Sequence, residues 1–274
     1  MIRADLHTHT TYSHAADQAE RMVEAARNKG LSVFGISEHS PRPEGYLYPS
    51  DYQEKLQAKY PDYIREIQEL RNANTPDFTV LLGLEADFMP DKPDFSKKSG
   101  AAADFDYIIG GLHFQGTWGF DCCQSDWDAL RTEDKYNCYT KYYHDLAYMI
   151  TSGIIDIVAH PDLIKIFSVE VFRAWLRLPS SKKLLHSTLG LIRECNLLME
   201  VSSAGLRKPC GEIYPGPEIM RLAADLDLKI CLSSDAHSAD QIAYAFDELE
   251  KYAKSYGYTE SYIVQGSKQH PLGF

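Results

Sequence analysis

Long hydrophobic runs are missing from this chain of 274 residues. A membrane-spanning helix needs roughly 18 consecutive apolar residues, and no such stretch is present. The first residues also lack an apolar run behind a basic region, which argues against a secretory signal. From these two absences we expect a cytoplasmic protein with no membrane partner.

Closely spaced cysteine pairs are missing as well. The six cysteines form no Cys-x-x-Cys motif, and their spacing does not suggest a disulfide framework. This pattern is typical of reduced thiols in a reducing compartment. We therefore expect the cysteines to have structural roles at most.

Basic runs are the third absence. The formal net charge is −11, and no cluster of lysine and arginine interleaved with aromatic residues offsets it. A strongly acidic chain repels nucleic acid, so we expect no nucleic-acid partner. Linker-like Gly/Ser segments are missing too, which favours one domain over residues 1–274.

The N-terminal stretch, by contrast, is rich in histidine. His7 and His9 lie two residues apart at the end of an apolar run, and His14 follows shortly after. Residues i and i+2 of an extended chain point to the same face, so both imidazoles can converge on one metal ion. Asp5 lies on the same face and could orient one of the rings.

Strand-like apolar runs recur along the rest of the chain. After the run that ends at His7, we expect strands over residues 31–37, 78–84, 106–111, 154–159, 197–201 and 228–232. Between them we expect helices over residues 17–29, 51–71, 181–196, 216–227 and 239–256, and a mainly helical region over residues 122–151. Pro61 should kink or split the second helix, and the tail after residue 256 should be irregular.

This alternation predicts parallel strands joined by right-handed crossovers, in one α/β barrel. Six of the seven strands have His, Glu or Asp at or just past the C-terminal end, where such barrels build active sites. One histidine in such a place is usually structural, but nine potential ligands at strand ends indicate a metal site. They are His7, His9, His14, His39, Glu85, His113, His160, Asp235 and His237.

Nine nitrogen and oxygen ligands are more than one ion needs. Zinc takes about four ligands and manganese or iron about six, so the set predicts two or three divalent ions. The two oxygens of a carboxylate such as Glu85 can bridge a pair of ions. The ligand types suit zinc, manganese or iron, and the absence of cysteine argues against a structural zinc site. Such a positive centre would attract a phosphate dianion.

Six short motifs occur in order along the chain: Asp5-x-His7-x-His9-Thr10, Glu38-His39, Gly83-x-Glu85, Gly111-x-His113, His160-Pro161 and Ser234-Asp235-x-His237. In this order and over essentially the whole length, the chain resembles the polymerase and histidinol phosphatase superfamily, known as PHP. Within that family it resembles the histidinol-phosphatase branch, through Tyr12-Ser13-His14 and the turn over residues 203–208.

The resemblance implies a distorted (β/α)7 barrel with up to three ions. The first ion would be held by His7, His9, Glu85 and Asp235, the second by Glu85, His113 and His160, and the third by His14, His39 and His237. The implied reaction is the hydrolysis of a small phosphate monoester, L-histidinol phosphate, to L-histidinol and phosphate in histidine biosynthesis. A metal-bridging hydroxide would attack the phosphorus.

Two further residues are catalytic candidates. Arg207, on the turn after the sixth strand, could bind the phosphate through two parallel hydrogen bonds, although it could also be an ordinary surface arginine. Asp17 could act as a general acid or orient a ligand, but its place before a helical pattern favours an N-cap.

Other polar residues lie near the predicted pocket mouth. Glu38, Asp162 and Lys165 could support ligands or contact substrate, but we expect solvated loop charges. The tyrosine-rich loop over residues 46–52 is a candidate lid above the substrate.

Three alternatives stay open at this point. The same scaffold could act on phosphotyrosine or a nucleotide phosphoester, because the sequence contains no decisive specificity motif. A non-catalytic PHP module usually lacks some ligands, whereas all nine are present here. A metal-dependent amidohydrolase barrel also has His-x-His on its first strand, but it would ordinarily show a bridging lysine in the role that Glu85 takes here.

Overall fold

Seven parallel strands form the centre of the fold, as the sequence predicts. A computed structural model of the chain describes residues 1–46 and 50–274. The strands pair in the order in which they follow along the chain. They are β1 (Ala4–Asp5), β2 (Val33–Ile36), β3 (Thr79–Asp87), β4 (Tyr107–Gly111), β7 (Ile157–Val158), β8 (Leu198–Ser202) and β9 (Ile230–Ser233).

The first and last strands of this sheet approach each other just past their C-terminal ends. Thr8 forms a parallel bridge with Ala236, and the backbone N–H of His9 donates to the Ala236 carbonyl at 2.8 Å. The contact nearly closes the sheet, so the predicted distorted (β/α)7 barrel is confirmed.

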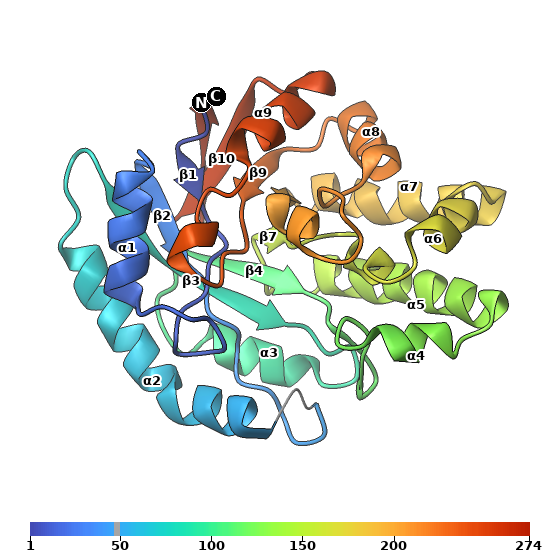
Figure 1. The fold of residues 1–274 in the computed structure, drawn as a ribbon, viewed down its shortest axis with the longest axis horizontal. Coiled ribbons are helices and arrows are strands. Elements are labelled where there is room, and N and C mark those ends of the chain that lie inside the picture. Colours follow the sequence, from blue (N-terminus) through green and yellow to red (C-terminus); the bar gives the residue numbers. More distant parts are fainter. Residues whose placement is uncertain (47–49) are drawn as a thin grey trace.

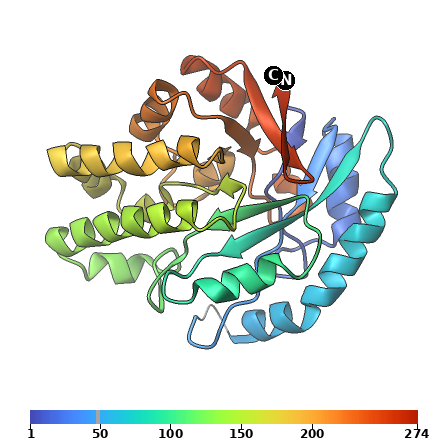
Figure 2. The same cartoon turned by 180° about the vertical axis from the view of Figure 1, so that it is seen from behind.

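Helices cover the outside of the barrel (Figures 1 and 2). They are α1 (Ala19–Asn28), α2 (Ser50–Asn72), α3 (Pro93–Gly100), α4 (Gln124–Asp128), α5 (Thr132–Thr151), α6 (Val169–Leu176), α7 (Pro179–Glu194), α8 (Pro217–Asp225) and α9 (Phe246–Ser255). Within the described ranges, no helix combines the length and the apolar character that crossing a membrane requires. The candidate lid over residues 46–52 includes residues 47–49, which lie outside the described residues.

Tyr107 fills the barrel interior below the strand ends. Its side chain is buried, and its hydroxyl donates to the carbonyl oxygen of Leu6. A Cβ on Gly35 would lie 1.9 Å from the Tyr107 hydroxyl oxygen, and one on Gly83 would lie 2.5 Å from the ring. Two neighbouring strands therefore need glycine where they face Tyr107. The packed interior gives the strand ends above it a rigid base.

The second helix differs from its prediction. α2 runs through Pro61 without a break, so Pro61 does not split it. A proline inside a helix removes one backbone hydrogen bond, but tertiary packing can offset that loss. Tyr60 and Tyr63, on either side of Pro61, are buried against the barrel, and the Tyr63 hydroxyl donates to the carbonyl oxygen of Gly83.

The last helix begins later than predicted, at Phe246 instead of residue 239. Ala243 and Ala245 have positive φ angles of 52° and 50°, which a continuous α-helix does not allow. The Ala243 N–H donates to the Asp5 carboxylate at 3.1 Å, so a tertiary contact takes the place of a helical hydrogen bond. The residues before it form only a short 3-10 turn, Ala239–Gln241.

The tail is not irregular, and that prediction is wrong. It forms an antiparallel hairpin of β10 (Glu260–Gln265) and β11 (Lys268–Gly273). Val264 is buried against the apolar barrel interior, and Tyr262 and Leu272 pack against the same cluster. The hairpin therefore gains its stability from covering the barrel, which the largely polar segment did not indicate by its own pattern.

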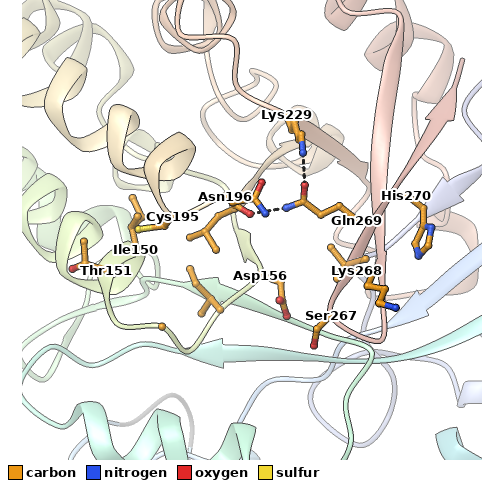
Figure 3. Close-up of a pocket in the computed structure, with 14 residues that line it drawn as sticks. Ile150, Thr151, Asp156, Cys195, Asn196, Lys229, Ser267, Lys268, Gln269 and His270 are labelled. Carbon is orange, nitrogen blue, oxygen red and sulfur yellow. Dashed lines mark hydrogen bonds between the residues drawn. The ribbon is translucent and has the colours of Figure 1, made fainter.

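The hairpin also forms one side of an open hollow of about 890 Å³ (Figure 3). Asp156 and Lys229, which line it, directly precede strands β7 and β9, so the hollow lies at the N-terminal end of the barrel. Gln269 crosses it, accepting from Lys229 Nζ at 2.9 Å and donating to the Asn196 carbonyl at 2.6 Å. The clustered histidines lie at the opposite end of the strands.

Candidate metal centre

Glu85, near the end of β3, is the central carboxylate of the histidine cluster. Its side chain is fully buried, and its two oxygens face different imidazoles. Around Oε2 lie His39 Nδ1 at 2.8 Å, His7 Nε2 at 3.3 Å and His9 Nε2 at 3.5 Å. Around Oε1 lie His160 Nε2 at 3.2 Å and His113 Nε2 at 3.5 Å. This division is the geometry that a carboxylate bridging two metal ions requires.

Asp235 is the second carboxylate of the cluster. Its Oδ1 lies 3.3 Å from His9 Nε2, 3.8 Å from His7 Nε2 and 3.5 Å from His237 Nδ1. Asp235 therefore stands between the pair of histidines after β1 and the histidine that follows β9. Its φ angle of 49° lies in the left-handed region, so neighbouring contacts must hold this turn.

His14 lies at the outer edge of the cluster. The centroid of its ring is 4.4 Å from that of His237 and 5.2 Å from that of His39. The residue is exposed, unlike the other candidate histidines. The structure thus brings all nine predicted ligands together, and their assignment to individual ions stays a prediction.

The donor atoms fit metal ions by their spacing and by their lack of other partners. Among the described residues, His7 Nε2, His9 Nε2 and Glu85 Oε2 are buried without a hydrogen-bond partner. Buried polar atoms are normally paired, so unpaired atoms that face one another indicate a cation site. Four ligand triplets have donor atoms within 4.8 Å of one another: His7–His9–Glu85, Glu85–His113–His160, His9–His39–His237 and His39–Asp87–His113.

Two buried carboxylates outside the predicted set form hydrogen bonds with the outer nitrogens of these rings, and a third lies close to one. The pairs are Glu200 with His7 at 2.7 Å, Asp87 with His113 at 2.6 Å and Glu38 with His9 at 3.6 Å, each measured to Nδ1. In every pair the other nitrogen, Nε2, faces Glu85. Carboxylates that fix the orientation of a ring in this way are typical partners of metal-binding histidines.

Two of these supports were missed in the sequence. Asp87 lies two residues after Glu85 on β3, so the alternation of a strand could have revealed it. Glu200 is an acidic residue inside the apolar run of β8, which is itself an unusual setting. Arg42, fully buried, donates to both oxygens of Asp87 at 2.7 and 2.9 Å, and no local pattern indicated this pair.

The three residues expected to be solvated loop charges are buried, so that prediction is wrong. Glu38 is fully buried, and it accepts hydrogen bonds from the backbone N–H and the hydroxyl of Thr10. Asp162 and Lys165 are buried as a pair at 2.7 Å. Glu38 is hydrogen-bonded, and Asp162 and Lys165 form an ion pair, so all three charged groups have partners inside the protein. Such partners reduce the free-energy cost of burial.

The imidazoles control the charge of the central carboxylates. Burial by itself would raise the pKa of Glu85, but the surrounding rings, His39 and His7 foremost, lower it well below its usual value. Burial also opposes ionisation of Asp235, where His237 and His7 likewise lower the pKa well below its usual value. Both groups are therefore ionised near neutral pH, as metal ligands must be.

Asp5 supports a turn and not a ring, contrary to the sequence-based expectation. Its carboxylate accepts hydrogen bonds from the N–H and the hydroxyl of Ser234, at 2.9 and 2.6 Å. Ser234 directly precedes Asp235, so this contact fixes the backbone that presents the second carboxylate. Burial raises the pKa of Asp5 to about 6.

Arg207 is partly buried and is not an ordinary surface arginine. Its guanidinium donates to the carbonyl oxygens of Ser234 at 2.8 Å and Asp235 at 3.0 Å, and it lies over the ring of Tyr244. It therefore helps to hold the left-handed turn at Asp235. Its Nη1 is buried and has no hydrogen-bond partner among the described residues, and its contact with phosphate stays a prediction.

Asp17 does not cap the first helix, so the N-cap prediction is wrong. The N-cap of α1 is Gln18, and the Asp17 carboxylate instead accepts from the backbone N–H of Ala239 at 2.8 Å. The tertiary contact fastens the loop after His14 to the segment after His237. Its role as general acid stays a prediction.

A pocket of about 540 Å³ opens over the cluster. Leu163, Phe167 and Tyr214 give it an apolar and aromatic wall. Asp121 and Lys208 are charged residues that line the same space. The pocket thus combines a metal-binding floor with room and polarity for an organic ligand.

The fold and the cluster define a class of protein, an α/β barrel with a multinuclear metal site at the C-terminal ends of its strands. The sequence model of the PHP domain matches residues 5–204. The chain therefore belongs to the PHP family, and the resemblance stated from its motifs is confirmed.

Individual relatives cover almost the whole chain. The probable histidinol-phosphatase of Deinococcus radiodurans is 33% identical over 255 residues, which are 92% of this chain and 93% of the relative. The histidinol-phosphatase of Bacillus subtilis is 25% identical and covers 90% of this chain and 98% of the relative. A solved histidinol phosphate phosphatase from Lactococcus lactis, complexed with zinc, L-histidinol and phosphate, has the same fold, with a TM-score of 0.77 over 98% of both chains at 17% identity.

The variant Glu85→Gln should weaken metal binding by at least ~10-fold, because it removes the shared charge between the two groups of rings. Metal content measured by elemental analysis after gel filtration checks this, with circular dichroism as the test of folding. Glu69→Gln, at an exposed position of α2, is the matched control. Full metal content in the Glu85 variant would contradict a bridging role.

If a third ion binds as predicted, the variant His14→Ala should lose it and keep the pair beside Glu85. His14 touches the cluster at its outer edge, whereas Glu85 lies between the two inner groups. Metal counts per chain for this variant and for the exposed control His186→Ala make the comparison. Loss of all bound metal in His14→Ala would show that the ions are not divided in this way.

Proposed function

We propose that the protein hydrolyses L-histidinol phosphate to L-histidinol and phosphate with two or three bound divalent ions. One observation carries the proposal: the two oxygens of Glu85 face separate groups of imidazoles in a buried site. The relatives named histidinol-phosphatase, which match over about the full chain, support the choice of substrate.

Buried carboxylates of the chain orient two of the ligand rings. Glu200 and Asp87 hold the Nδ1 atoms of His7 and His113, so the Nε2 atoms point inward. Divalent ions bound there would supply a hydroxide nucleophile held between two ions and positive charge for the phosphoryl oxygens. The protein's contribution is a set of donor atoms that its own contacts direct toward one centre.

The charge balance of the site favours three ions over two. Five buried carboxyl groups of the cluster have a lowered pKa: Glu38, Glu85, Asp87, Glu200 and Asp235. Arg42 offsets one of these charges. Before a hydroxide is counted, two divalent ions would leave the centre about neutral, whereas three would leave about two positive charges. With one bound hydroxide only the three-ion centre stays positive, and a positive centre attracts a phosphate dianion.

The ligand types of the cluster suit zinc, manganese or iron, since they are all imidazoles and carboxylates. Zinc is the ion in the Lactococcus lactis structure. We propose zinc, manganese or iron for this chain, with the ion chosen by availability as well as by geometry.

The polarity of the pocket supports a phosphate ester with a cationic organic part. The positive charge of Lys208 helps to lower the pKa of Asp235 and of His237, on the metal side of the pocket. The negative charge of Asp121 helps to raise the pKa of the Tyr214 hydroxyl, on the aromatic wall. L-Histidinol phosphate has a phosphate at one end and an amine and an imidazole at the other. Its phosphate can pair with Lys208 while its cationic end pairs with Asp121.

Two basic residues are proposed to bind the phosphate. Lys208 lines the pocket directly, and Arg207 next to it has the buried, unpartnered Nη1. The Arg207 guanidinium already donates to two carbonyl oxygens, which restricts its movement. We therefore assign the main phosphate contact to Lys208 and a second contact to Nη1 of Arg207.

The test of this function is phosphate release from L-histidinol phosphate by protein loaded with zinc or manganese. We expect hydrolysis that a chelator abolishes and metal restores, with kcat/KM at least ~10-fold higher than for phosphotyrosine or a nucleoside monophosphate. A higher kcat/KM for either alternative substrate would replace the proposed specificity. No hydrolysis of any monoester by metal-loaded protein would favour a non-catalytic module.

The variant Asp121→Asn should impair the cationic substrate selectively. We expect KM for L-histidinol phosphate to rise by ~10-fold and KM for the uncharged ester phenyl phosphate to change by less than ~2-fold, because only the first has a positive group for Asp121. Asp128→Asn, at an exposed position of α4, is the matched control. An equal change for both substrates would show that Asp121 does not recognise the cation.

A further inference from the structure

A buried ion-pair network lies beside the pocket and apart from the metal cluster. Lys165, on the turn after β7, places Nζ 2.7 Å from Asp162 Oδ2 and 3.0 Å from Glu212 Oε2. The Asp162 and Lys165 side chains are each 1% exposed. Arg173 of α6 contacts the other oxygen of Glu212. Within the described residues, none of these four belongs to a group of potential metal ligands.

These four residues, called the Lys165 network below, connect two segments of the pocket wall. The turn over residues 161–167 contributes Leu163 and Phe167 to the wall. The loop over residues 208–216 contributes Lys208 and Tyr214. These segments follow different strands, β7 and β8, so their relative position depends on contacts between them.

The contacts on the second segment flank Tyr214. Asp162 Oδ2 accepts from the backbone N–H of Gly216 at 2.7 Å, and Lys165 Nζ donates to the carbonyl oxygen of Ile213 at 3.4 Å. A Cβ at Gly216 would lie 2.7 Å from Lys165 Nζ, so a larger residue here would require the ammonium or the loop to shift. Tyr214 itself pairs with Ser202 of β8 through two backbone hydrogen bonds, at 2.6 and 3.0 Å. The network adds contacts to Ile213 and Gly216, on either side of Tyr214.

The Tyr214 ring lies near both the network and the metal cluster. Lys165 Nζ is 5.3 Å from the centre of the ring. The His160 ring, a candidate metal ligand, is 6.4 Å away in an edge-to-face arrangement. A shift of Tyr214 would change the wall of the pocket without removing a ligand from the cluster.

Stability alone is a weak explanation for this network. A buried ion pair is often no more stabilising than apolar side chains of the same volume, because burial of the charges costs free energy. The network restricts the geometry of the two segments, since the Lys165 ammonium contacts two carboxylates and a carbonyl oxygen at once. Directional contacts fix a loop more closely than apolar packing does.

We propose that Lys165 is a positioning residue that sets the place of Tyr214 and thereby the fit of the substrate's ring. This inference rests on the proposed function, because it takes the organic part of L-histidinol phosphate as the group that packs against Tyr214. Lys165 acts on substrate binding and leaves metal binding and the chemical step intact.

The test compares Lys165→Met, Lys165→Arg and the exposed control Lys182→Met, all loaded with metal. Lys165→Met should raise KM for L-histidinol phosphate by ~10-fold, change kcat by less than ~3-fold and keep the wild-type metal content. Lys165→Arg, which keeps the positive charge, should have a KM close to that of the wild type. An unchanged KM in folded Lys165→Met, or a parallel loss of metal, overturns the proposal.

A second variant serves if Lys165→Met does not fold. Glu212→Gln leaves the Lys165 and Asp162 pair in place and changes a carboxylate that is 17% exposed. It should raise KM by ~3-fold with metal content unchanged, and an unchanged KM overturns the proposal. If the wild type does not hydrolyse L-histidinol phosphate, the proposed function fails, and the same variants are compared on the phosphate monoester that it does hydrolyse.

Discussion

Much of this structure depends on one charged carboxylate buried among imidazoles. Glu85 has no exposed surface, and five rings approach its two oxygens at 2.8 to 3.5 Å. Burying an ionised carboxyl group is costly unless positive charge compensates it, and bound divalent ions would provide that charge at the point where the rings converge. The barrel supplies the geometry, because its parallel strands bring residues far apart in sequence to one edge.

A second set of carboxylates explains how the imidazoles stay aligned. Glu200, Asp87 and Glu38 each face the outer nitrogen of one ring, while Asp5 and Arg207 hold the turn that presents Asp235. The same acidic residues reduce the excess positive charge of the site. Substrate attraction by a protein of net charge −11 therefore depends on the number of ions and on Lys208 at the pocket wall.

The sequence predicted the parts of this arrangement that have a local pattern. Strands ending in His, Glu or Asp could be recognised from short apolar runs, and all nine predicted ligands lie in one cluster. Asp87 and Glu200 stand out locally as acidic residues within strands, but which ring each one supports could not be found in that way: His7 and Glu200 are 193 residues apart, and only the barrel brings them together. Burial of Asp162 and Lys165, and the hairpin that covers the barrel with Val264, are likewise tertiary effects that local polarity concealed.

Anomalous diffraction from crystals grown with zinc and phosphate would locate each ion relative to Glu85 and so test the bridging role of this carboxylate. We expect an ion on each side of the carboxylate, one beside His7 and His9 and one beside His113 and His160. A third ion is expected near His39 and His237, and phosphate is expected to contact the ions. A single ion, or ions that do not contact Glu85, would contradict the bridging role of Glu85.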